Sequence, residues 1–169
     1  MAKNMFKLID GIETEEGLNF FVDYDDEELR LNRVKPALAR VKADQTYRIP
    51  LKNIIDLRIV TKKEVEEKNK SVVARGLAGG FLFGPVGLFL GGLSGTGKKE
   101  KNKYNAIFVI SYLSSNDSET IRSIVFDASF GNWQMTNSSY VKKLQKMLKN
   151  VEPSKSVMAI RNSDGSITL

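Results

Sequence analysis

The chain has 169 residues, a hydrophobic fraction of 41% and a net charge of +6, and it contains neither cysteine nor histidine. Disulfides, thiolate nucleophiles, zinc–thiolate sites, imidazole bases and histidine-ligated metals are therefore excluded. The length predicts one domain. Nothing in the composition requires an enzyme, and we expect no catalytic residue, no cofactor and no metal site.

Charge is unevenly distributed along the chain. Residues 1–30 carry a net charge of −6, and residues 31–169 carry +12. This asymmetry predicts an acidic region near the N-terminus and a basic remainder, which could face nucleic acid, anionic lipid or an acidic protein. The first ten residues lack the apolar core of a secretory signal, so we expect a cytoplasmic protein, with peripheral attachment to the membrane as an alternative.

Period-two alternation predicts a mainly β body. Strands are expected at residues 6–12, 18–24, 29–34, 47–59, 104–113 and 121–126, with polar turns that join the second to the third and the fifth to the sixth as hairpins. Pro50 marks a sheet edge or a junction between strand and turn. The acidic run at residues 23–28 is predicted to be a solvated turn, because Glu28 and Val34 stand where a calcium loop needs glycine and glutamate.

Apolar residues recur at spacings of three and four over residues 137–150, which predicts one amphipathic helix that Pro153 ends. Its lysines, which point away from the apolar face, could bind phosphate but are more simply a solvated surface. Trp133 is expected to anchor the helix on the sheet. We expect a single domain over residues 1–152 and a C-terminal tail over 153–169, with one extra strand at 157–160.

A glycine-rich insert at residues 76–97 is the most informative feature. Its 22 residues are uncharged and include nine glycines. Glycines recur every four residues on both sides of Pro85, in two small-xxx-small stripes that predict a hairpin of two closely packed helices. This glycine stripe consists of Gly76, Gly80, Gly84, Gly87, Gly91 and Gly95.

The same hairpin would push large side chains outward. We call these the apolar contact set: Phe81, Leu82, Phe83, Leu88, Phe89 and Leu90. Such a patch needs a cover, which could be a protein partner, a second copy, a bilayer interface or the β body itself. Positive charges surround the insert and form its basic flank: Lys62, Lys63, Arg75, Lys98, Lys99, Lys101 and Lys103.

Residues 92–98 match the first seven positions of a phosphate-binding P-loop, but Lys99 occupies the place of the magnesium-binding Ser or Thr. We interpret the segment as the exit of the insert, with nucleotide binding as a lower alternative.

Several strands followed by one C-terminal helix resemble a pleckstrin-homology (PH)-like domain, and the local sequence is similar to small members from Gram-positive bacteria and their phages. The matching stretches are IPLKNIIDLRIV (residues 49–60), RGLAGGFLFGPVGLFLGGLSG (75–95), the strand after it and SYVKKLQKML (139–148), within residues 17–150. The resemblance implies an α+β, mainly β fold: a bent antiparallel sheet or partial barrel capped by one amphipathic helix, here with an inserted glycine-rich helical hairpin.

The resemblance also implies a binding platform without a shared catalytic set. Lipid-binding members carry Lys and Arg in an early hairpin loop, whereas the corresponding hairpin here is acidic, which argues against phosphoinositide binding. We therefore expect a non-enzymatic binding or adaptor domain that uses the insert for protein contact, self-association or contact with an anionic membrane surface. The alternative is a phage-encoded inhibitor of a host protein or nucleic-acid enzyme, with nucleic acid a weaker partner; no small-molecule substrate is indicated.

Overall fold

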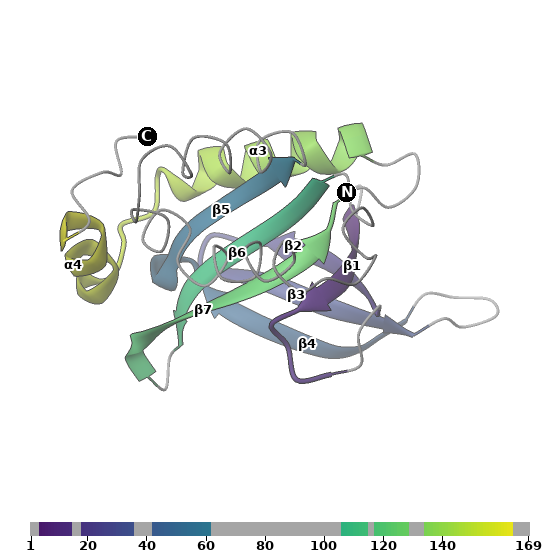
Figure 1. The fold of residues 1–169 in the computed structure, drawn as a ribbon, viewed down its shortest axis with the longest axis horizontal. Coiled ribbons are helices and arrows are strands. Elements are labelled where there is room, and N and C mark those ends of the chain that lie inside the picture. Colours follow the sequence, from purple (N-terminus) through teal and green to yellow (C-terminus); the bar gives the residue numbers. More distant parts are fainter. Residues whose placement is uncertain are drawn as a thin grey trace, which may run out of the picture.

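The computed structural model describes residues 4–14, 18–35, 42–61, 106–114, 117–128 and 134–163. Within them, seven antiparallel strands form one sheet in the order β4-β3-β2-β1-β7-β6-β5 (Figure 1). The strands are β1 (Asn4–Asp10), β2 (Asn19–Tyr24), β3 (Glu28–Lys35), β4 (Lys42–Pro50), β5 (Ile54–Thr61), β6 (Ala106–Ser114) and β7 (Asp117–Asp127). The helical elements are η1 (Leu51–Asn53), α3 (Gln134–Leu148) and α4 (Lys155–Ser163).

Both predicted hairpins are confirmed. Strand β2 pairs with β3, with Asp23 opposite Arg30, and β6 pairs with β7, with Ile110 opposite Ile124. Pro50 is the last residue of β4, the strand at one end of the sheet order, and η1 follows it directly. A proline is tolerated there because it interrupts no interior ladder.

Four phenylalanines form the centre of the core. Phe6, Phe20, Phe108 and Phe126 come from β1, β2, β6 and β7, and each has an exposed fraction of 0%. The ring centroids of Phe6 and Phe108 lie 5.0 Å apart, and those of Phe20 and Phe126 lie 5.7 Å apart. The sheet bends so that β2–β4 lie behind β5–β7 (Figure 1), which brings these inward side chains together.

Helix α3 packs along the sheet and is bonded to two of its strands. Val141 and Leu144 are buried in the core on one face of the helix. The Tyr140 hydroxyl donates to the Val22 carbonyl of β2 at 2.7 Å, and the Gln145 side-chain amide donates to the Leu57 carbonyl of β5 at 2.6 Å. The predicted amphipathic helix is thus confirmed, although it begins at residue 134.

The predicted strand at residues 157–160 is wrong, because these residues belong to α4. The Ser154 hydroxyl accepts a hydrogen bond from the Val157 amide at 3.4 Å, as an N-terminal helix cap does. Val157 is completely buried, and the Ser154 amide donates to the Lys52 carbonyl at 2.8 Å. The periodicity of a four-residue apolar run is compatible with either a strand or a helix. Here the Ser154 cap favours the helix.

Gly11 allows β1 to leave the sheet. Its φ of +96° is a left-handed conformation, and a Cβ there would lie 2.1 Å from the Ser123 carbonyl oxygen of β7. The β1–β7 register shifts just before it, between Leu8 and Asp10. Both the backbone conformation and the close approach of β7 therefore require glycine.

We expect Gly11→Ala to lower the free energy of unfolding by about 2–4 kcal/mol, because the new Cβ meets backbone that cannot rotate away. Urea denaturation monitored by circular dichroism measures the change. Glu13→Ala, an exposed position in the same loop, is the control and should stay within about 0.5 kcal/mol of the parent. Equal stabilities of the two variants would show that Gly11 is dispensable.

Tyr140→Phe tests the attachment of α3 to β2. Removing the hydroxyl leaves the Val22 carbonyl without its donor in a partly buried place, so we expect a loss of about 1–2 kcal/mol. Tyr47→Phe is the matched control, because no hydrogen bond of the Tyr47 hydroxyl occurs within the described residues. A cost as small as that of Tyr47→Phe in thermal or urea unfolding would contradict the role assigned to this bond.

Candidate functional site

The connection that contains the insert, residues 62–105, begins and ends at one end of the sheet. Thr61, the last residue of β5, lies opposite Ala106, the first residue of β6. The Ala128 amide, just beyond β7, donates to the Ala106 carbonyl at 3.0 Å and fixes this end of the ladder. The apolar contact set, the glycine stripe, the basic flank and the P-loop-like stretch all fall between Thr61 and Ala106, outside the described residues.

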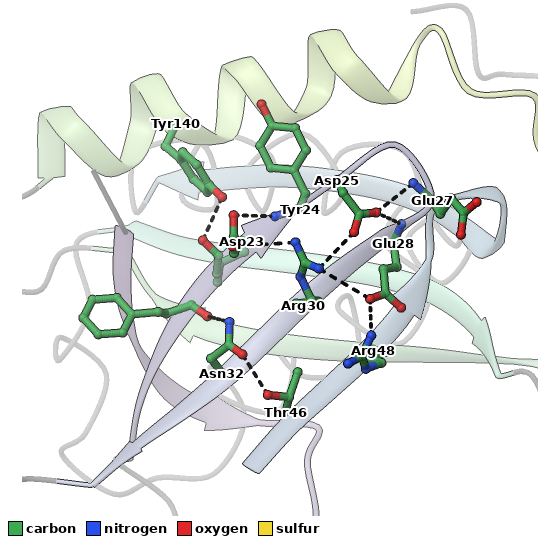
Figure 2. Close-up of polar contacts among 12 residues, drawn as sticks. Asp23, Tyr24, Asp25, Glu27, Glu28, Arg30, Asn32, Thr46, Arg48 and Tyr140 are labelled. Atoms are coloured by element: carbon green, nitrogen blue, oxygen red, sulfur yellow. Dashed lines mark hydrogen bonds and ion pairs between the residues drawn. The ribbon is translucent and has the colours of Figure 1, made fainter. Parts of the chain in front are cut away.

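The acidic run forms the turn between β2 and β3, as predicted. One Asp25 carboxylate oxygen accepts backbone N–H bonds from Glu27 at 2.9 Å and from Glu28 at 3.0 Å (Figure 2). These bonds, with a smaller contribution from Arg30, lower the pKa of Asp25 below its ordinary value of 3.8. The carboxylate thus shapes the turn, as Asp residues commonly do.

Arg30 and Arg48 pair with three acidic residues in and beside the turn. The Arg30 guanidinium lies 2.9 Å from Asp25, 3.7 Å from Asp23 and 3.8 Å from Glu28 (Figure 2). Arg48 of β4 forms an ion pair with Glu28 from the other side. These contacts use the acidic residues to join β2, β3 and β4, which is a structural role.

A second charged surface lies between the edge strand β5 and helix α3. The two elements enclose an open groove of about 330 Å³. Lys142 and Lys146 line it from α3, where a spacing of four places them on one side of the helix, and Lys149 lines it from the turn that follows. The complete lining is Ile55, Asp56, Leu57, Lys142, Gln145, Lys146, Leu148 and Lys149.

The groove carries positive charge over an apolar floor. Within the part of the chain that the structure describes, none of the three lysines forms an ion pair, and all three are exposed. Asp56 is the acidic residue of the lining, and it already pairs with Arg58 at 2.7 Å. The sequence indicated the lysines but not the groove, because nothing local identifies β5 as the strand beside α3.

In the described ranges, no three acidic side chains converge in a way that could hold a metal ion. None of the helices in those ranges is long and apolar enough to cross a membrane.

The strand order and helix α3, which packs along the sheet after the last strand, define a PH-like domain, a class that generally serves as a non-enzymatic binding module. The chain belongs to the family described as "Glycine zipper containing PH domain", whose model matches residues 12–128. The match extends from the loop after β1 to the end of β7 and includes residues 76–97. Neither a curated protein nor a solved structure matches the chain.

The turn carboxylate Asp25 gives a pH-dependent prediction. Because its pKa is lower in the folded protein, its contribution to stability is present above the unfolded pKa, near 3.8, and is lost as the pH falls through the folded value. We expect Asp25→Ala to be less stable than the parent at pH 7, with the difference shrinking in acid. Urea denaturation at pH 7 and pH 3 measures both differences.

Asp26→Ala is the matched control for this experiment. Asp26 is exposed in the same turn, and no contact of its side chain occurs within the described residues. We expect it to change stability little at either pH. If Asp25→Ala and Asp26→Ala behaved alike at pH 7, the hydrogen bonds of Asp25 would not stabilise the turn.

Proposed function

We propose that the protein is a non-enzymatic binding or adaptor domain that uses the glycine-rich insert, with its basic flank, as its partner surface. The length of the β5–β6 connection carries this proposal. The two strands are antiparallel neighbours, and such strands need a link of only about 2–5 residues. Here the link comprises residues 62–105, far more than the sheet requires. Long connections on a rigid scaffold commonly carry function.

The composition of the insert supports contact with a partner. Glycines at every fourth position allow close packing of helices, and the apolar contact set then needs a cover. Contact with another protein or with a second copy would bury those side chains. Contact with an anionic membrane surface is the alternative, in which the basic flank would contribute about 1 kcal/mol per lysine near the lipid.

Deletion of residues 76–97 tests the proposal. The deletion leaves residues 62–75 and 98–105 to connect β5 and β6. The β5–β6 ladder can therefore still close. We expect the shortened protein to lose self-association or liposome binding, as measured by size-exclusion chromatography with light scattering, with and without anionic liposomes. An unchanged oligomeric state together with unchanged liposome binding would refute the proposal.

Two variants of full length separate the modes of contact. Phe81→Ser/Phe83→Ser/Phe89→Ser keeps the length and the charge, and should abolish either kind of contact. Lys98→Gln/Lys99→Gln keeps the apolar contact set, and should weaken liposome binding while self-association persists. Circular dichroism of each variant confirms that the β body remains folded.

A further inference from the structure

We propose that the groove between β5 and α3 is a second docking surface, which binds an acidic segment of a partner protein with an apolar side chain among its carboxylates. The groove is lined by described residues that lie outside the insert in the sequence. Leu57 is four residues from Thr61, about 13 Å along the strand, and the groove extends from there toward the start of β5.

The lysines of the groove indicate that the ligand carries carboxylates. Lys142, Lys146 and Lys149 line one wall without ion pairs among the described residues, while the acidic residue of the lining pairs with Arg58. The groove therefore attracts carboxylates, and exposed lysines of this kind steer encounter and set specificity.

The apolar part of the lining indicates that the ligand also carries an aliphatic side chain. Ile55 and Leu148 are half-buried and leave apolar surface exposed in the concave site, whereas Leu57 is buried. A ligand of charge alone would leave this surface in contact with water, whereas an inserted aliphatic side chain would cover it. A flat bilayer surface does not reach into such a site, which favours a protein segment.

The geometry also indicates how the segment is recognised. Gln145 donates to the Leu57 carbonyl at 2.6 Å, so this backbone acceptor of the edge strand is already occupied at the groove. An incoming strand cannot use that carbonyl to extend the sheet. Recognition at this point therefore depends on side chains, through lysine–carboxylate pairs and apolar contact.

The β2–β3 turn of a second copy supplies only part of this chemistry. The exposed residues of the β2–β3 turn are Asp25, Asp26 and Glu27, which are all carboxylates. The nearest aliphatic side chain, Leu29, has an exposed fraction of 0%. The turn could meet the lysines of another copy but offers nothing to the floor.

Fluorescence anisotropy with the full-length protein tests the proposal. The probe is a labelled eight-residue peptide of alternating glutamate and leucine, compared with peptides in which glutamine replaces glutamate or serine replaces leucine. We expect binding by the first peptide alone, weakened about tenfold or more when salt rises from about 0.05 M to about 0.5 M.

Matched charge reversals locate the site on the protein. Lys146→Glu should weaken binding at least about threefold, and Lys142→Glu/Lys146→Glu/Lys149→Glu at least about tenfold. Lys143→Glu is the control, because Lys143 is exposed on the same helix but does not line the groove, and it should leave the affinity unchanged. The protein lacking residues 76–97 should bind the peptide as the parent does, which separates this inference from the proposed function.

Four outcomes would overturn the inference. They are the absence of peptide binding at low salt, equal losses from Lys146→Glu and Lys143→Glu, self-association that Lys146→Glu abolishes, and anionic vesicle binding that is sensitive to Lys146→Glu without peptide binding. The third would make the occupant a second copy, and the fourth would make it a membrane.

Discussion

The attachment of α3 to two separate strands is the constraint on which the rest of the domain depends. Tyr140 bonds to β2 and Gln145 bonds to β5, strands that are separated by β1, β7 and β6 in the sheet order. One helix thereby bridges two parts of a bent sheet, while Val141 and Leu144 cover the core between them. The same placement sets the lysines of α3 beside β5 and so creates the groove.

Opposite charges have different roles in this domain. Three acidic residues in and beside the β2–β3 turn are used within the fold. Asp25 accepts two backbone N–H bonds and pairs with Arg30, and Glu28 pairs with Arg48. Asp23 lies 3.7 Å from Arg30. Within the described residues, the lysines of α3 have no such partners. The net charge of +6 therefore does not mark the protein uniformly as a binder of anions. The lysines that line the groove are among the described basic side chains without an ion pair.

The features that the sequence predicted well are local ones. Alternation and polar turns indicated the β2–β3 and β6–β7 hairpins, and apolar spacing indicated α3. The sequence did not reveal what depends on distant pairing: Gln145 meets Leu57 across 88 positions, and no local pattern indicates that contact. The strand expected at residues 157–160 was wrong because a short apolar run fits either structure, and the Ser154 cap favours a helix. The predicted contact residues of the insert remain predictions.

The pairing of Thr61 with Ala106 has a consequence for how this family can vary. Both ends of the connection meet at a single ladder position, so the pairing itself sets no particular length for the chain between them. Each doubling of a flexible loop costs about 0.6 kcal/mol. The closed ladder is therefore a junction at which the length of the connection could change at a small entropic cost to the paired strands.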